Sequence, residues 1–160
     1  YTGVKGGFVV ISADDPGPHS SQTEQDSRLI ALVAKIPVFD PSTPAEAREV
    51  IKDAFALSER YKIPVILRPT TRLCHAVQSL SIDGAHEPDD GIPSVKFHRD
   101  PPLWTATPKF RNLLHVELNK KLKALKKLNP NAIAISIYDD ESIKEVAKIL
   151  NIITKGKHVD

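Results

Sequence analysis

The chain has 160 residues, of which 41% are hydrophobic and 26% are charged, and its formal net charge is +2. A chain of this length forms about one domain and can bury a core without disulfides or a structural metal. The near balance of acidic and basic residues gives no overall case for binding nucleic acid or membranes. The single cysteine excludes an internal disulfide and any zinc or iron–sulfur site built from cysteines of this chain.

Two features of the sequence concern its origin. No apolar run approaches the roughly 18 residues of a membrane-spanning helix, and no signal-peptide pattern is found at the start. The sequence holds no methionine and begins at Tyr1, beside a glycine-rich turn. We therefore expect it to be an internal or trimmed piece of a longer protein.

Three short apolar runs in the first half of the chain predict buried strands. Residues 8–13 (FVVISA) have the length and β-branching of a strand that is buried on both faces. Residues 37–40 and residues 63–67 (IPVIL) predict two further strands. Helices are predicted between these runs, with short connections. This order predicts right-handed βαβ units, and therefore an α/β fold in which helices flank a parallel sheet.

Both intervening helices have sequence signals at their starts. Ser21 and Glu24 have the spacing of a capping box before the first helix. The apolar residues of that helix are Leu29, Ile30, Leu32 and Val33. The second helix is predicted to follow the N-cap Thr43, with Pro44 at its first position and Glu46 completing the box. Apolar residues then recur every three or four positions, which predicts an amphipathic helix against one side of the sheet.

The second half of the chain is predicted to hold a linker and a basic helix. Residues 76–106 are rich in proline and lack periodicity, which is typical of a connecting segment. Residues 107–130 predict a third helix, whose stretch from Lys109 to Lys127 has seven basic residues and one acidic residue. The net charge of +6 leaves −4 for the rest of the chain. This helix is either a contact for an acidic partner, nucleic acid or membrane surface, or simply a solvated face.

The last residues, 131–160, predict the start of a further α/β unit. Residues 132–138 (AIAISIY) read as a strand, residues 142–150 as a helix and residues 152–154 as the beginning of another strand.

A ligand site is expected at the carboxyl ends of the strands, where ligands bind in open parallel sheets. Residues 14–28 leave the first strand there and form the most polar stretch of the chain. Helix capping alone accounts for Ser21 and Glu24. It does not account for the neighbouring polar residues His19, Ser20, Gln22, Gln25 and Arg28. The functional interpretation is a helix N-terminus that meets a carboxylate or another polar ligand, with His19 as proton donor or contact. The alternative is an ordinary solvated loop.

Two arginines follow the third strand. Arg68 and Arg72 bracket a Pro-Thr-Thr sequence, and guanidinium groups at such a place suit carboxylate or phosphate recognition. The alternative is a pair of charges that mark the exit of the strand into solvent. Cys74 and His75 are adjacent, which does not make a nucleophile and base, and Cys74 reads better as a small apolar residue. The motifs of phosphate loops, dinucleotide sites, zinc proteases and hydrolase elbows are all missing.

The first 28 residues, which include the segment 19–28 (HSSQTEQDSR), closely resemble a known family. They are similar to the alpha subunits of indolepyruvate:ferredoxin oxidoreductases, a branch of the 2-oxoacid:ferredoxin oxidoreductase family. Residues 35–42 (KIPVFDPS) and 64–72 (PVILRPTTR) resemble the same subunits in the same order. The likeness covers residues 1–75, whereas residues 73–130 share only the layout of a linker and a basic helix.

This resemblance implies a fold and an activity that the spacing of residues does not. Residues 1–75 would be the C-terminal half of a pyrimidine-type thiamine diphosphate-binding domain, incomplete at its N-terminal side. The parent enzyme would convert aryl 2-oxo acids such as indolepyruvate to acyl-coenzyme A and pass electrons to ferredoxin. The implied cofactors are thiamine diphosphate with Mg, and 4Fe-4S clusters held outside this chain. The implied partners are a beta subunit and ferredoxin, with no nucleic acid or membrane, and the implied location is cytoplasmic.

The resemblance also implies that a set of residues lines the substrate side of the cofactor cleft. They are His19, Ser20, Ser21, Gln22 and Gln25, to which position adds Arg68 and Arg72. No residue is assigned as catalytic, no metal ligand is assigned, and the piece alone is expected to be inactive. The alternative function is a non-catalytic α/β interaction module that uses the basic helix as its contact surface.

Overall fold

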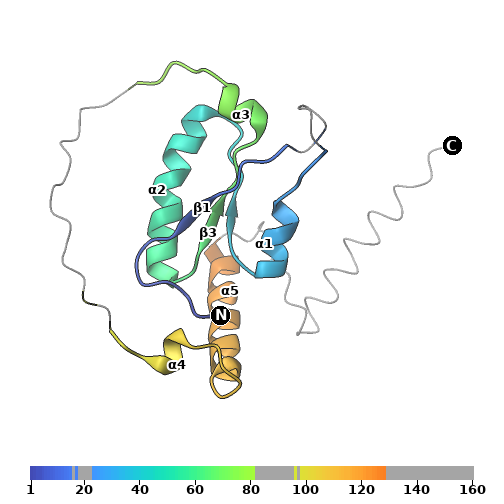
Figure 1. The fold of residues 1–160 in the computed structure, drawn as a ribbon. Coiled ribbons are helices and arrows are strands. Elements are labelled where there is room, and N and C mark those ends of the chain that lie inside the picture. The colour runs from blue at the N-terminus through green and yellow to red at the C-terminus, as the bar shows by residue number, and fades with distance from the viewer. Residues whose placement is uncertain (16, 18–22, 82–95, 97, 129–160) are drawn as a thin grey trace.

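A computed structural model describes residues 1–15, 17, 23–81, 96 and 98–128 of the chain. Its sheet is parallel and has the strand order β1-β3-β2 (Figure 1). The strands are β1 (Val9–Ile11), β2 (Val38–Phe39) and β3 (Val65–Leu67). Val10 pairs with Ile66 on one side of β3, and Val38 pairs with the same residue on the other side. The predicted α/β fold with a parallel sheet is confirmed, and all three strands lie within their predicted ranges.

Five helices lie within the described ranges. They are α1 (Arg28–Ala34), α2 (Pro44–Tyr61), α3 (Thr71–His75), α4 (Pro101–Trp104) and α5 (Arg111–Leu128). Figure 1 shows α2 on one side of the three strands and α1 on the other, as a layered α/β arrangement requires. The core lies mainly between α2 and β3, whose three residues are all buried.

The start of α2 forms as its sequence predicts. Thr43 is the N-cap, and its hydroxyl oxygen accepts a hydrogen bond from the amide of Glu46 at 3.2 Å. The Glu46 carboxylate accepts in return from the amide and the hydroxyl of Ser42, at 2.8 and 2.7 Å. The reciprocal bond of the box therefore comes from Ser42 instead of the N-cap itself. These contacts satisfy amides that the first turn of a helix otherwise leaves unpaired.

Ser58 joins α2 to the starts of two strands and is fully buried. Its hydroxyl oxygen accepts a hydrogen bond from the amide of Phe8 at 2.9 Å, and it donates to the carbonyl of Ile63 at 2.7 Å. One small polar side chain thus pairs backbone groups ahead of both β1 and β3, and the bond to Ile63 is buried.

Ser58→Ala is expected to lower the free energy of unfolding by about 1–3 kcal/mol, because it removes the partner of a partly buried amide and of a buried carbonyl. Urea unfolding followed by circular dichroism measures this loss. Ala56→Ser, at an exposed position of the same helix, is the matched control and is expected to stay within about 0.5 kcal/mol of the parent. Equal stabilities of the two variants would contradict the role of Ser58.

The capping box predicted from Ser21 and Glu24 is wrong. The helix begins at Arg28 with Ser27 as its N-cap, so Glu24 precedes the helix, and Ser21 lies outside the described residues. The reason is a tertiary contact: the amide and hydroxyl of Ser27 both donate to one oxygen of Asp14, at 2.6 and 2.8 Å. This contact fixes the chain at residue 27 and delays the helix by several residues.

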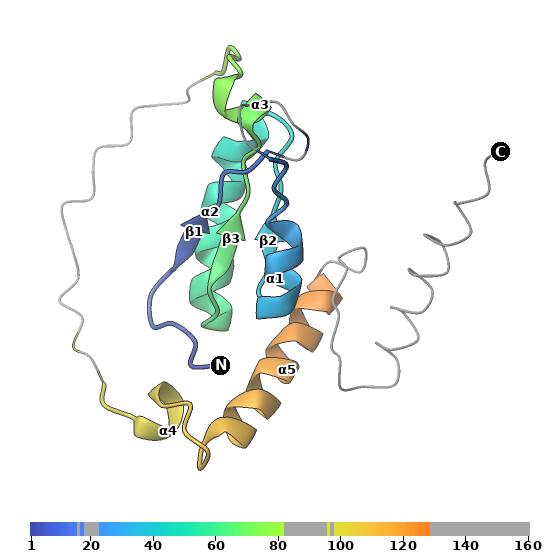
Figure 2. The ribbon, with the colours of Figure 1, turned by 45° about the vertical axis from the view of Figure 1, so that its right-hand side comes forward.

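The expected burial of β1 on both faces is also wrong within the described structure. Its residues are half-buried or exposed, and the side chain of Ile11 is 66% exposed. The apolar side of α1 is exposed as well: Leu29 and Ile30 are open to solvent and Val33 is 84% exposed, whereas Ala31 is buried. Figure 2 shows β1 as an outer strand of the sheet, with only β3 beside it.

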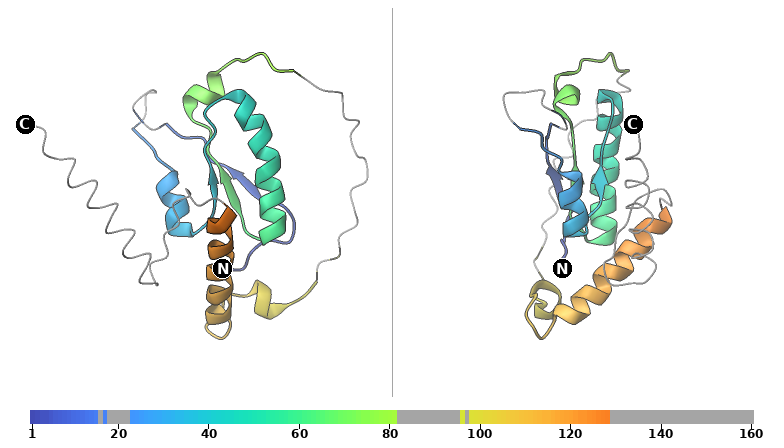
Figure 3. Two further views of the ribbon diagram at one scale, coloured as in Figure 1. Left: turned by 180° about the vertical axis from the view of Figure 1, so that it is seen from behind. Right: turned by 90° about the vertical axis from the view of Figure 1, so that its right-hand side faces the viewer.

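The third predicted helix is found as α5, which packs beside the N-terminal segment (Figure 3). Leu114 and Leu118 are buried, and the ammonium group of Lys121 donates to the carbonyl of Lys62 at 3.1 Å. Residues 76–106 contain the short helix α4, which the sequence did not predict. The strands and helix predicted within residues 131–160 lie outside the described residues. None of the helices in the described ranges combines the length and the apolar character needed to cross a bilayer.

Candidate functional site

Arg68 is the centre of a polar cluster at the carboxyl ends of the strands. Its side chain is 2% exposed, and its Nε donates to Oδ2 of Asp14 at 2.8 Å. Its Nη1 donates to Oδ2 of Asp40 at 2.9 Å. Asp14 follows β1, Asp40 follows β2 and Arg68 follows β3, so one guanidinium links the ends of all three strands. Parallel strands make this possible because their carboxyl ends lie at the same edge of the sheet.

The cluster keeps its central groups charged. Burial disfavours the ionised form of Asp14, but hydrogen bonds from Arg68 and Ser27 outweigh burial and hold the pKa of this carboxyl below its usual range. Burial likewise acts against the charge of Arg68, and the hydrogen bond to Asp14 and the charge of Asp40 raise the pKa of the guanidinium in spite of it. The buried ion pair is therefore fully formed at neutral pH.

A second arginine extends the cluster toward the solvent. The guanidinium of Arg28 contacts the Asp26 carboxylate at 2.6 Å and lies 3.8 Å from Asp40. The hydrogen bonds from Arg28 lower the pKa of Asp26 to about 2, because they favour its ionised form. Asp26 in turn lies 3.8 Å from Arg68, so the two arginines and three aspartates make one connected network.

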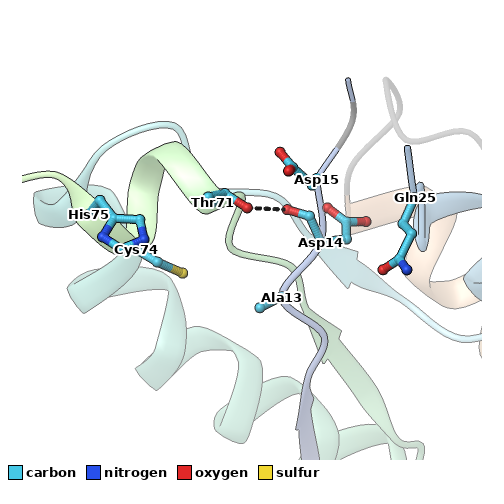
Figure 4. Close-up of a pocket in the computed structure, with 7 residues that line it drawn as sticks. All are labelled: Ala13, Asp14, Asp15, Gln25, Thr71, Cys74 and His75. Atoms are coloured by element: carbon cyan, nitrogen blue, oxygen red, sulfur yellow. Dashed lines mark hydrogen bonds between the residues drawn. The ribbon is translucent and has the colours of Figure 1, made fainter. Parts of the chain in front are cut away.

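An open pocket of about 270 Å³ lies beside this network (Figure 4). It is lined by Ala13, Asp14, Asp15, Gln25, Thr71, Cys74 and His75. The loop after β1 forms one wall and α3 forms the other. The two walls are joined at Thr71, whose amide donates to the carbonyl of Asp14 at 3.1 Å. The hydroxyl of Thr71 lies 3.4 Å from the same carbonyl, as the dashed line in Figure 4 marks.

Three carboxylate oxygens beside this pocket have no hydrogen-bond partner among the described residues. They are Oδ1 of Asp14 and both side-chain oxygens of Asp15, and all three are buried. Asp15 is 9% exposed, and its backbone carbonyl accepts from the amide of Gln25 at 3.0 Å, which fixes the residue in place. Buried polar atoms in proteins are normally paired, so three unpaired acceptors together mark this pocket as unusual.

The structure places the predicted site residues in different surroundings. Gln25 lines the pocket. Arg68 lies under the pocket wall, where Asp14 and Asp40 occupy its guanidinium, and Arg72 is exposed on α3. The remaining candidates, His19, Ser20, Ser21 and Gln22, lie outside the described residues. Cys74 and His75, both judged weak from the sequence, line the pocket through α3.

The sequence reasoning did not single out Asp14, Asp15 and Asp40 as site residues. A signal was present: Asp14 and Asp15 follow the first predicted strand and Asp40 is the last residue of the second, so all three belong to the edge where a site was expected. Among the described residues, no group of three or more histidine, cysteine, aspartate or glutamate side chains is arranged to hold a metal ion.

Comparison with curated proteins gives a consistent set of relatives. Over 127 residues the chain is 41% identical to indolepyruvate oxidoreductase subunit IorA of Methanothermobacter thermautotrophicus, a match that covers 79% of this chain and 20% of that protein. Over 150 residues it is 38% identical to the subunit of the same name from Methanothermobacter marburgensis, covering 93% of this chain and 24% of that protein. Over 75 residues it is 56% identical to IorA of Pyrococcus abyssi, covering 47% of this chain and 12% of that protein.

The predicted resemblance to the alpha subunits of indolepyruvate oxidoreductases is therefore confirmed. The chain spans only 12–24% of the length of these relatives. No protein-family model matches the chain, and no solved structure matches it significantly.

Proposed function

We propose that this chain, a relative of indolepyruvate oxidoreductase subunit IorA, is part of an enzyme subunit that oxidatively decarboxylates aryl 2-oxo acids. The single observation that supports this most is the similarity of most of the chain to oxidoreductase subunits of that name. The proposed reaction converts indolepyruvate and coenzyme A to an acyl-coenzyme A and CO₂, and passes the electrons released to ferredoxin. A beta subunit would complete the enzyme, and this piece alone would be inactive.

The proposed cofactor is thiamine diphosphate, which supplies a nucleophilic carbon and an electron sink for decarboxylation. The described residues suit only part of such a group. Asp14 and Asp15 bring negative charge to the lining of the pocket, which repels phosphate oxygens. We therefore propose that the diphosphate, its Mg ion and the 4Fe-4S clusters are held by other parts of the parent enzyme.

Within this chain, the loop that follows β1 is proposed to line the substrate side of the cleft. Gln25 supports this, because it lines the pocket and its side-chain amide can both donate and accept hydrogen bonds. His19, Ser20, Ser21 and Gln22 belong to the same loop and are proposed to share this role. Arg68 is proposed to act indirectly, since the position of Asp14 at the pocket depends on its guanidinium.

His19→Ala and Gln25→Ala, made in the complete complex, are each expected to lower kcat/KM with indolepyruvate about tenfold or more, which corresponds to roughly 1.4 kcal/mol of lost transition-state binding. Gln78→Ala is the matched control: this exposed glutamine lies outside the pocket, where it accepts from the amide of Ala45. Steady-state kinetics with ferredoxin reduction as the readout measures the effect. Unchanged kcat/KM in both variants would refute the proposal that this loop contacts the substrate.

The exposed edge of β1 supports the proposal that residues 1–75 are half of a domain. Phe8 accepts from the amide of Val65 at 3.0 Å, and Ser12 donates to the carbonyl of Leu67 at 2.9 Å. Because parallel ladders use alternate residues, Val9 and Ile11 present their backbone groups to the side away from β3. An apolar strand with a free edge is a template for a further strand, and we propose that the parent subunit supplies it.

The remaining segments keep their expected roles in this proposal. Residues 76–106 would connect domains, residues 107–130 would be a basic linker helix, and residues 131–160 would begin another unit.

A further inference from the structure

We infer that one side of α5 is a docking surface for an acidic amphipathic helix of a partner protein. The surface consists of Leu113, Val116, Lys120, Lys123 and Lys127, which we call the outer stripe. These residues follow one another at intervals of three or four positions, so they lie on one side of the helix. The inference does not depend on the proposed oxidoreductase function, because it rests on this helix alone.

The lysines of the outer stripe have no evident structural task in the described part of the chain. Lys121, by contrast, is half-buried on the inner side of α5, where its ammonium group donates to a backbone carbonyl at 3.1 Å. Lys123 and Lys127 are exposed and form neither a hydrogen bond nor an ion pair with a described residue. Lys120 lies 3.8 Å from Glu117, but such an exposed pair contributes little to stability. The positive charge on this side of α5 is therefore available to a partner.

The N-terminal end of the outer stripe is apolar and exposed. Leu113 and Val116 are 67% and 52% exposed, whereas Leu114 and Leu118 on the opposite side of the same helix are buried. A single exposed apolar side chain needs no explanation on a protein surface. Here two of them adjoin and continue a row of lysines, so the stripe has an apolar half and a basic half. This combination suits a partner that is itself half apolar and half acidic.

The composition of the outer stripe favours a protein over nucleic acid or a membrane. Arginine forks and aromatic rings, which suit phosphates and bases, are missing from it. A helix that lies on a membrane inserts a broad apolar face, and the broad apolar face of α5 packs inward through Leu114 and Leu118. A second helix matches the stripe better, because its own side chains recur at the same intervals of three and four residues.

The order of residues along the stripe predicts the direction of the partner helix. Its lysines lie toward the C-terminal end of α5, where the helix dipole favours positive charge, and the dipole of the partner favours carboxylates near its own N-terminus. Both preferences are met if the partner runs antiparallel to α5, with its acidic first turns over the lysines and its apolar residues over Leu113 and Val116. The contact would extend over about 21 Å, since a helix rises about 1.5 Å per residue.

The test is a titration of the full chain, at pH 7 and low ionic strength, with a fluorescently labelled, alanine-rich helical peptide. The peptide has three glutamates in its first turns and two leucines further along, at the intervals of the outer stripe. The control peptide has the same composition, with its glutamates and leucines distributed around the helix. We expect anisotropy to give a Kd of roughly 10–100 µM for the first peptide and binding about fivefold or more weaker for the control. No binding of the first peptide, or equal binding of both, would overturn the inference.

Two pairs of variants place the contact on the outer stripe. Lys123→Glu is expected to weaken binding of the first peptide about tenfold. Lys52→Glu makes the same change in net charge at an exposed lysine of α2, and is expected to weaken it no more than about threefold. Val116→Gln is expected to weaken it about threefold, whereas Leu128→Gln, at a similarly exposed position roughly a third of a turn around α5, is expected to leave it unchanged. Equal losses within either pair would contradict a contact on the outer stripe.

The other classes of partner are outcomes of the same experiment. Duplex DNA of random sequence and vesicles of anionic phospholipid are titrated into the same chain under the same conditions. Tighter binding of either than of the peptide, lost in Lys123→Glu and kept in Lys52→Glu, would show that the outer stripe recognises that class and would overturn the inference. We expect only weaker binding that both variants reduce equally, as non-specific attraction to basic residues requires.

Discussion

Arg68→Met is expected to lower the free energy of unfolding of the chain by about 3–5 kcal/mol, because removing one partner of a buried ion pair leaves the other charge uncompensated. Methionine has a similar length and fills the same space, so packing is largely kept. What is lost are the two hydrogen bonds to Asp14 and Asp40, at 2.8 and 2.9 Å. A loss of this size is a large share of the 5–15 kcal/mol that typically stabilises a domain.

Urea unfolding at pH 7 measures this effect, and Arg72→Met is the control. Arg72 is an exposed arginine four residues further along the chain, so its replacement is expected to change stability by no more than about 0.5 kcal/mol. Equal stability of both variants would mean that the buried pair contributes nothing beyond packing.

The same pair gives the effect of Arg68→Met a defined pH dependence. Because the folded-state pKa of Asp14 is depressed, its contribution is present above the unfolded pKa of about 3.9 and is lost as the pH falls through the folded value. In Arg68→Met the stabilisation that comes from pairing Asp14 with Arg68 is absent at every pH. The difference in stability between the parent and the variant is therefore expected to shrink below about pH 4.

Val33→Lys is expected to affect the isolated chain and the complete subunit very differently. In the chain Val33 is 84% exposed, so lysine is expected to change stability by no more than about 0.5 kcal/mol. If the parent subunit covers the apolar side of α1, the same lysine is buried there without a partner. We then expect a loss of about 2–5 kcal/mol in the complete subunit.

Thermal unfolding of both forms distinguishes these cases, with Asp53→Lys on the exposed side of α2 as the control. A complete subunit that tolerates Val33→Lys as well as the isolated chain does would show that α1 is uncovered there too. That result would count against a half-domain and leave the free edge of β1 as its structural support.

The parts of the fold that depend on local signals were predictable from the sequence. Thr43, Pro44 and Glu46 are neighbours in the chain, and their spacing alone gives the start of α2. The start of α1 was not predictable in this way. Its position depends on Ser27 meeting Asp14, thirteen residues earlier, which is a contact that only the folded sheet provides.

The candidate site shows the same difference between local sequence signals and contacts that only the folded chain provides. The pocket lies at the edge that the rule for parallel sheets indicates, and Gln25 lines it, while the role of Gln25 in a ligand site stays a prediction. The surroundings of Arg68 could not be read from its neighbours, since its carboxylate partners come from two other segments of the chain. The exposure of β1 was missed for a related reason. Its apolar composition is typical of a strand that is buried on both faces, whereas β3 is the only strand beside it among the described residues.

The position of Arg68 has a kinetic consequence. Its two hydrogen-bonded partners lie 54 and 28 residues away in the sequence, so the ion pairs form only after all three strands have been brought together. Contacts that close such long loops contribute little until most of the chain is ordered. The cluster is therefore expected to be largely absent from the transition state for folding and to act mainly by slowing unfolding. Arg68 then determines how long the native structure persists more than how quickly it is reached.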